Sequence, residues 1–129
     1  MNEVIKEWIE KAEADYRTAE REFAVQDGFN YDAVCFHAQQ CIEKLTKALL
    51  IKYHIIPPKT HDLIVLQQLV PPFCKKTLSE TNDLRFLSSA AVTFRYPGES
   101  ADKDDASESL RICRKLRKEL QETLDKPGE

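Results

Sequence analysis

Glycine is scarce in this chain, which has three glycines among 129 residues, together with one tryptophan and one methionine. β-Branched residues are sparse outside short runs, whereas Ala, Leu, Glu, Lys and Arg dominate. The frequent residues are strong helix formers, so the composition favours an all-α fold. With 42% hydrophobic and 32% charged residues, the chain is expected to fold around one hydrophobic core rather than to be disordered.

Long apolar runs and an excess of positive charge are also missing. No apolar run of about 18 residues occurs, so we expect no transmembrane helix and no membrane partner. The N-terminus, MNEVIKEWIE, is amphipathic and acidic, which predicts no signal peptide and a cytoplasmic location. Nineteen basic against 22 acidic side chains give a net charge of −3. That balance argues against whole-surface attraction to nucleic acid, although a local basic patch remains compatible with it.

Closely spaced cysteine pairs are absent as well. The four cysteines are Cys35, Cys41, Cys74 and Cys113, and their spacing matches no zinc pattern. Three of them fall on helical apolar stripes, where cysteine behaves as a small hydrophobic residue. We therefore expect reduced, structural cysteines, and neither a metal nor a cofactor.

Hydrophobic periodicity predicts five helices, over residues 3–25, 31–53, 61–70, 73–94 and 102–124, followed by a frayed tail over 125–129. Asn30 is expected to cap the second helix and Thr60 the short third one. The residues expected to face the core are Leu63, Leu66 and Val70 in the third helix, and Leu84, Leu87, Ala91 and Phe94 in the fourth. Four long helices with short links and one short extra helix predict an antiparallel bundle, forming one domain over residues 1–129.

Polar residues alternate with apolar ones along residues 36–50, FHAQQCIEKLTKALL. Within it His37, Gln40, Lys44 and Lys47 recur at three- and four-residue steps and form one polar column. The column is either a solvated or partly buried polar face, with Glu43 and Lys47 as a helix ion pair, or the wall of a site. In a site, lysine supplies charge to a phosphate and glutamine supplies paired hydrogen bonds to a base edge. The residues alone leave both interpretations open.

Three motifs in order resemble the HEPN domain family. The segment 36–50 resembles its signature helix, Thr60-His61-Asp62-Leu63 its threonine-histidine-x-leucine motif, and Arg95-Tyr96-Pro97 its arginine-tyrosine-proline motif. Trp8, Ala12 and Asp15 fit its usual first helix, so the resemblance covers about residues 3–124. It implies a four-helix up-and-down bundle with a short fifth helix, commonly a homodimer. It also implies a detached substrate-binding subunit of a minimal nucleotidyltransferase, in pairs that often behave as toxin and antitoxin.

One feature of the RNA-cutting members is missing. Those members carry an arginine, four to six intervening residues, and a histidine. Here the histidines are His37, His54 and His61, and none follows an arginine at that spacing. The reaction needs a histidine to move protons near neutral pH and an arginine to hold the phosphate. The resemblance therefore implies a binding protein without catalytic residues of its own.

The resulting hypothesis is a nucleotide- or RNA-binding subunit that partners a separate nucleotidyltransferase. Its expected ligand residues are Lys44, Lys47 and Arg95 for phosphate, His37, Gln40 and Tyr96 for orientation, and His61 for an anion at the start of the third helix. A capping or packing role explains His61 more simply, and helix termination accounts for Arg95-Tyr96-Pro97 equally well.

Two alternatives remain open. One is a diverged metal-independent ribonuclease toxin that uses His37 or His61 with Arg95. The other is a dimerisation or interaction module without a ligand.

The last helix carries the basic residues Arg111, Arg114, Lys115 and Lys118. They are better explained as a solvated face that follows the helix dipole than as an RNA surface.

Overall fold

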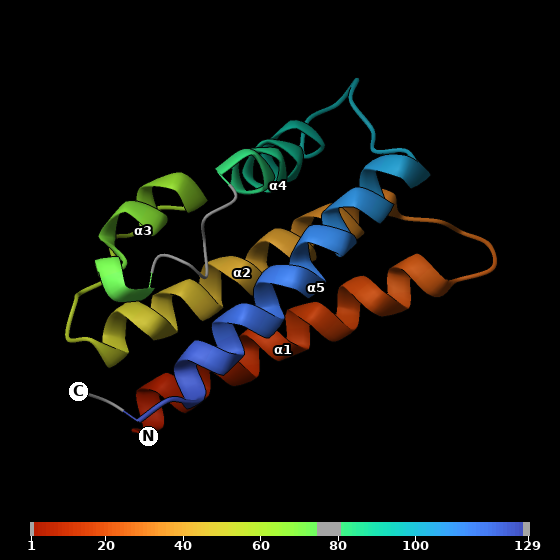
Figure 1. Ribbon diagram of the computed structural model, residues 1–129. Helices are drawn as coiled ribbons and strands as arrows, with labels where there is room; N and C mark the ends of the chain where they lie inside the picture. The colour runs from red at the N-terminus through yellow and green to blue at the C-terminus, as the bar shows by residue number, and fades with distance from the viewer. Residues whose placement is uncertain (1, 75–80, 128–129) are drawn as a thin grey trace.

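Five α-helices form an antiparallel bundle in the computed structural model, which describes residues 2–74 and 81–127. They are α1 (Glu3–Ala24), α2 (Tyr31–Lys52), α3 (Leu63–Leu69), α4 (Thr81–Thr93) and α5 (Lys103–Asp125). α1 and α4 run in one direction and α2 and α5 in the other, so both ends of the chain lie at the same end of the bundle (Figure 1). The predicted all-α bundle with one short extra helix is confirmed.

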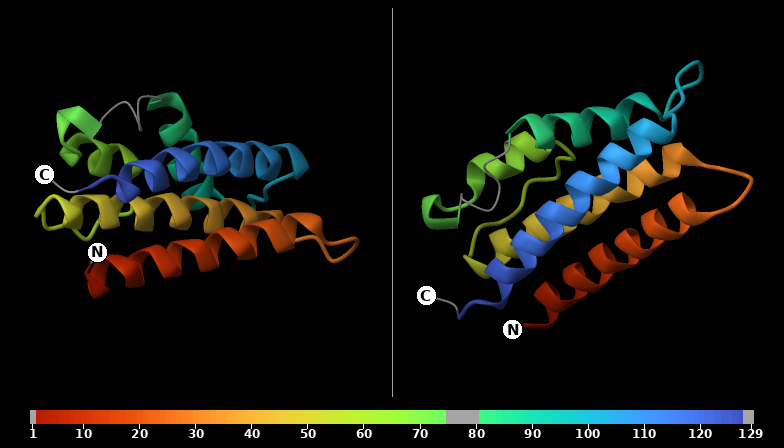
Figure 2. Two further views of the ribbon diagram at one scale, coloured as in Figure 1. Left: turned by 60° about the horizontal axis from the view of Figure 1, so that its bottom comes forward. Right: turned by 45° about the vertical axis from the view of Figure 1, so that its right-hand side comes forward.

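α2 is the central helix of the bundle and contacts each of the other four (Figure 2). Its buried positions are apolar for the most part, but they include Gln39, Glu43 and Lys47. Buried polar groups require partners, so these three residues mark a polar network inside the bundle. None of the helices in the described ranges combines the length and the apolar character that crossing a membrane requires.

The core follows the predicted apolar pattern closely. Leu63, Leu66 and Val70 are buried around α3, as expected, and so are the predicted positions in α4 as far as Ala91. Phe94, by contrast, is only half-buried, because it follows the last residue of α4.

The short third helix differs from its predicted form. It spans Leu63–Leu69 rather than 61–70, and its N-cap is Asp62, not Thr60. The Asp62 carboxylate accepts the Ile64 amide at 2.9 Å, whereas the Thr60 hydroxyl accepts the Asp62 amide at 3.1 Å. Thr60 therefore shapes the turn ahead of the cap, and the helix begins two residues later than expected.

The fourth helix also departs from the prediction at its start. Phe73 and Cys74 lie in a short 3₁₀ turn, in which the Cys74 amide donates to the Pro71 carbonyl at 2.8 Å. Helix therefore does not begin at Phe73, and the described part of α4 starts at Thr81. The predicted helical residues 75–80 lie outside the described residues. The other three helices match their predicted limits to within one residue at each end.

Two helix ends are held in ways that the sequence did not indicate. α2 ends in a Schellman motif, in which the amides of His54 and Ile55 donate to the carbonyls of Ile51 and Leu50 at 3.0 and 2.9 Å. His54 has a φ of 63°, a left-handed conformation that usually favours glycine. At the end of α5, Lys52 of α2 donates to the carbonyls of Thr123, Leu124 and Lys126, so the tail predicted to fray from residue 125 is held to α2 at Lys126.

Candidate functional site

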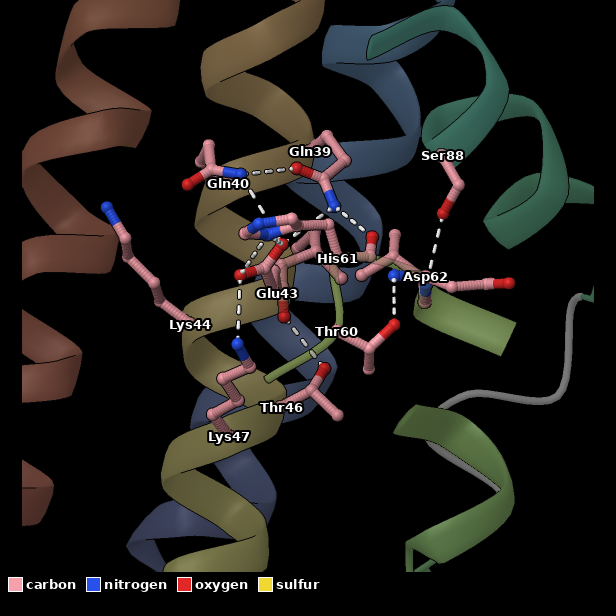
Figure 3. Close-up of polar contacts among 12 residues, drawn as sticks. Gln39, Gln40, Glu43, Lys44, Thr46, Lys47, Thr60, His61, Asp62 and Ser88 are labelled. Atoms are coloured by element: carbon pink, nitrogen blue, oxygen red, sulfur yellow. Dashed lines mark hydrogen bonds and ion pairs between the residues drawn. The ribbon is translucent and has the colours of Figure 1, made fainter. Parts of the chain in front are cut away.

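The polar column predicted on α2 divides between two buried carboxylates, and the first is Asp15 of α1. The Lys44 ammonium donates to one Asp15 oxygen at 2.6 Å, and His37 Nδ1 lies 2.8 Å from the other. Lys44 extends towards α1 and away from the other labelled side chains (Figure 3). Because Asp15 is only 8% exposed, these contacts form part of the α1–α2 interface. The charge of Lys44 is thereby neutralised within the fold.

The second carboxylate is Glu43, which is 3% exposed and gathers four donors (Figure 3). Lys47 Nζ donates to Glu43 Oε2 at 3.1 Å, and Gln39 Nε2 donates to Oε1 at 3.2 Å. Gln40 Nε2 lies 3.4 Å from the same Oε1 atom, and His61 Nδ1 lies 3.0 Å from it. An ionised carboxylate can accept about four hydrogen bonds, so Glu43 is fully used.

The two glutamines link this carboxylate to the segment before α3. Gln39 Nε2 also donates to the His61 carbonyl at 2.9 Å, and Gln39 Oε1 accepts from Gln40 at 2.8 Å. Lys47 lies 5.8 Å from the centre of the Trp8 ring, which adds a cation–π contact. Among the described residues, no buried side-chain nitrogen or oxygen lacks a hydrogen-bond partner. The network is therefore complete without a ligand, and it fixes the orientation of its members.

A cleft of about 160 Å³ lies beside this network, between α2, the start of α3 and α4. Its lining residues are Phe36, Gln39, Gln40, His61, Ser88, Ala91, Val92 and Arg95. Ser88 also accepts the Leu63 amide at 3.1 Å, so that α4 holds the first turn of α3 in place. The cleft is thus built from three elements that are hydrogen-bonded to one another.

Arg95 and His61 give this cleft its chemical character. The Arg95 guanidinium carbon lies 5.7 Å from the centre of the Phe36 ring. No acidic side chain in the described ranges pairs with Arg95, which is exposed just beyond α4. Since Nδ1 of His61 faces Glu43, its Nε2 is the ring nitrogen left for another contact. The cleft therefore offers a guanidinium without a described carboxylate partner, an imidazole nitrogen and two amide side chains.

The structure brings three of the seven predicted ligand residues into the cleft: Gln40, His61 and Arg95. The remaining four lie elsewhere: His37 and Lys44 contact Asp15, Lys47 contacts Glu43, and Tyr96 is 64% exposed and outside the lining. The predicted helix ion pair between Glu43 and Lys47 is present, and both of its side chains are buried.

Sequence reasoning missed Gln39, Glu43 and Ser88 as members of the site. Phe36, Gln40, Glu43 and Lys47 recur at three- and four-residue steps, so they form a second stripe on α2 that shares Gln40 and Lys47 with the predicted column. That stripe carries the central carboxylate, and its spacing was visible in the sequence. Ser88 carried no comparable signal, because its role comes from a contact with a distant amide.

Four basic residues of α5 are engaged in ion pairs with other helices, whereas Lys118 is exposed. Arg114 pairs with Glu20 at 2.6 Å, and this hydrogen bond is the main cause that lowers the pKa of Glu20. Arg117 pairs with Glu13 at 2.5 Å and lies 4.1 Å from the centre of the Tyr16 ring. Arg111 and Lys115 both contact Asp83 of α4. This face joins α5 to α1 and α4, and is more constrained than the simple solvated face that was expected.

All four cysteines are free thiols in buried positions. A hydrogen bond with Cys113, together with burial, raises the pKa of the Cys41 thiol well above its usual value. Burial also raises the pKa of Cys35. Because the thiolate is the reactive form, neither thiol suits nucleophilic chemistry near neutral pH. In the parts of the chain that the structure describes, no three His, Cys, Asp or Glu side chains are grouped to hold a metal ion.

The fold and the site together define a small helical-bundle protein with a polar cleft beside its central helix. The family model of the HEPN domain matches residues 5–123, and the chain belongs to this family. Among solved structures, TT1696 from Thermus thermophilus is similar, with 20% identity, a TM-score of 0.69, and coverage of 92% of this chain and 96% of that one. ST0689, described as an archaeal HEPN homologue, is 24% identical with a TM-score of 0.70, covering 94% and 98%. No curated protein sequence matches the chain significantly.

Proposed function

We propose that this protein is a non-catalytic nucleotide- or RNA-binding subunit, which holds a phosphate-bearing ligand in the cleft beside α2. The observation that carries the proposal is the state of Arg95, which faces the cleft with no carboxylate partner among the described residues, while Lys44 and Lys47 are both paired. A guanidinium presents a planar fork of donors that fits two phosphate oxygens. The guanidinium carbon lies 5.7 Å from the centre of the Phe36 ring, a cation–π contact that favours positions beside that ring.

The other cleft residues would orient the ligand. Gln40 carries both a donor and an acceptor, as recognition of a base edge requires. His61 offers Nε2, and its ring is held from the opposite side by Glu43. Lys44, Lys47 and His37 would act indirectly, by holding the two carboxylates that shape α2. Tyr96, the exposed residue that follows Arg95, would close over a bound ligand.

The proposal includes partners that the family resemblance implies. The chain would form a homodimer in the cytoplasm and would pair with a separate minimal nucleotidyltransferase, in a toxin–antitoxin-like arrangement. The absence of the Arg-to-His spacing supports a role in which the partner supplies catalysis. Light scattering is expected to give a mass near twice 14.9 kDa. Co-expression with a nucleotidyltransferase encoded in a neighbouring reading frame is expected to yield a stable complex.

Calorimetry with ATP and with a nucleoside monophosphate tests the binding role. Arg95→Ala is expected to weaken binding at least tenfold, since a charge-assisted pair contributes about 1.5–3 kcal/mol. Arg21→Ala is the matched control, because Arg21 is an exposed arginine on α1 away from the cleft. If Arg95→Ala binds both nucleotides as tightly as the wild type does, the cleft is not the binding site.

A second function has one observation in its favour. His61 is oriented by a buried carboxylate and shares a cleft with Arg95, which resembles the carboxylate–histidine arrangement used for proton transfer. This would be the diverged ribonuclease, with His61 rather than the Asp15-bound His37 as the proton carrier. Purified protein that leaves a mixed RNA pool intact over hours would reject it. Stable partner binding without any nucleotide binding would instead indicate an interaction module.

A further inference from the structure

One face of α4 carries a second arginine that the proposed function does not use. Arg85, Ser88 and Val92 follow one another at three- and four-residue steps, so they lie along one side of α4, and Arg95 follows in the turn just beyond it. Ser88 and Val92 line the cleft with Arg95, and they also line a wider adjoining hollow with Arg85. The two hollows share His61 as well. They are therefore two parts of one continuous groove along α4.

The adjoining hollow has a volume of about 500 Å³ and is more open than the cleft. Arg85 borders it together with Ser89, and both provide hydrogen-bond donors. The Arg85 guanidinium donates to the Asn82 side chain at 3.4 Å, and no carboxylate pairs with it in the described ranges. This distinguishes Arg85 from Arg111, which pairs with two acidic residues.

The charges that face the groove favour an anion. Asp62 is the acidic residue at the open hollow, and one of its oxygens already accepts the Ile64 amide at 2.9 Å. Glu43 lies behind the cleft and is balanced by Lys47 at 3.1 Å. Among the described residues, two guanidinium groups without a carboxylate partner therefore outweigh one exposed carboxylate, and they stand at opposite ends of the groove.

The distance between the two arginines defines the size of ligand that can reach both. They are ten residues apart along α4 and its final turn, which corresponds to about 15 Å at the rise of an α-helix. Each strand of a duplex carries one phosphate for about every 3.4 Å of axis, and an extended single strand spaces its phosphates more widely, so roughly four to five nucleotide steps are the upper limit for bridging that distance. A further phosphate of the same strand, rather than the single phosphate of a mononucleotide on Arg95, is therefore the group expected at Arg85.

We infer that Arg85, with Ser88 and Ser89 beside it, forms a second phosphate subsite, and that the ligand of the groove is a single-stranded oligonucleotide rather than a mononucleotide. This inference rests on the proposed function, because it takes Arg95 as the first phosphate site. Val92 is 52% exposed between the two arginines and gives an apolar surface against which a base can pack. The groove thus has a phosphate-binding arginine at each end and an apolar surface between them. This arrangement matches the alternation of phosphates and bases along a single strand.

Binding of a hexanucleotide, as RNA and as DNA, compared with a nucleoside 5′-monophosphate, tests the subsite. We expect Arg85→Ala to weaken hexanucleotide binding about tenfold at low salt, with either sugar, and to leave monophosphate binding unchanged. Arg95→Ala should weaken both ligands. The slope of log affinity against log salt should become shallower by about 0.7 in Arg85→Ala, the loss of one phosphate contact on a single strand. Arg21→Ala should bind both ligands as the wild type does.

The outcomes separate the inference from the function on which it rests. If Arg95→Ala weakens both ligands but Arg85→Ala weakens neither, the second subsite is wrong and the cleft remains the binding site. If Arg85→Ala weakens the monophosphate as much as the hexanucleotide, both arginines hold one phosphate and the oligonucleotide inference is overturned. If Arg95→Ala changes neither affinity, the proposed function fails and the subsite fails with it.

Discussion

The buried ion pair between Glu43 and Lys47 offers the most demanding test of the polar network. Glu43→Gln keeps the shape of the side chain and one acceptor oxygen, but it removes the negative charge. The Lys47 side chain is 8% exposed, so its ammonium would remain inside the bundle without a counter-charge. The cation–π contact with Trp8, at 5.8 Å, compensates only in part.

Removing one partner of a buried ion pair costs about 3–5 kcal/mol, because the other charge is left uncompensated. The glutamine retains hydrogen-bonding capacity towards Gln39 and Gln40, so we expect a loss near the lower limit, about 3 kcal/mol. For a domain of this length each kcal/mol lowers Tm by roughly 3–5 °C, so the expected shift is about 10 °C or more.

Urea unfolding followed by circular dichroism measures this loss of stability. A double-mutant cycle with Lys47→Met shows whether the uncompensated charge of Lys47 causes it. In Glu43→Gln/Lys47→Met neither member of this pair carries a charge, and we expect at least half of the lost stability to return. Glu3→Gln is the control, because the Glu3–Lys6 pair is 90% and 53% exposed and such pairs contribute less than about 1 kcal/mol. A Glu43→Gln protein as stable as the Glu3→Gln protein would refute the reasoning, and so would a double variant less stable than Glu43→Gln alone.

Three further predictions concern helix ends and one surface ion pair. His54→Gly should raise the unfolding free energy by about 1 kcal/mol in urea, because glycine adopts the left-handed conformation of this position without strain; unchanged or lower stability would contradict this. Asp102→Ala should cost about 1 kcal/mol, since it removes the capping box that Asp102 forms with Asp105, and a cost near zero would show that the cap is not needed. The third change is Glu20→Gln, for which the unfolding free energy is compared with that of the wild type across pH. The pKa of Glu20 is lowered in the folded state, so its ionisation favours folding. The advantage over Glu20→Gln should be complete above the unfolded-state pKa of about 4.3 and lost as pH falls through the lower folded pKa. Its size should stay below about 1 kcal/mol because both partners are partly solvated, and a difference that grew towards acidic pH would have the wrong sign.

The helices could be predicted from the sequence because burial repeats along them with the period of the helix. Leu63 and Leu66 illustrate this, since each occupies the core position that periodicity assigned to it. The helix starts were harder to predict. Thr60 and Asp62 can both cap a helix, and the choice depends on which residue takes the extended backbone conformation, as Asp62 does here with a ψ of 111°. The prediction that the fourth helix begins at Phe73 was wrong because a 3₁₀ turn follows Pro71.

The candidate site shows a different limit of sequence reasoning. Spacing along α2 identified side chains that share a face, but it could not show which helix covers that face. His37 and Lys44 are covered by Asp15, which lies 22 and 29 residues away in the chain. Lys44 therefore contributes to the α1–α2 interface. The stripe through Glu43 had the same periodicity as the predicted column. Only the burial of Glu43 and Lys47 distinguishes their ion pair from one on a solvated face.

Ion pairing within the fold also decides which basic side chains can bind a phosphate. A phosphate that approached Lys47 would come close to Glu43, whose carboxylate lies 3.1 Å from the ammonium, and would place two anions together in a buried position. Binding at Lys44 would face the same cost from Asp15. At Arg95 a phosphate displaces no carboxylate of the described residues, and the guanidinium keeps its contact with Phe36. The two lysines that looked most suited to phosphate in the sequence are thus committed to the fold, whereas Arg95, just beyond α4, remains available for binding.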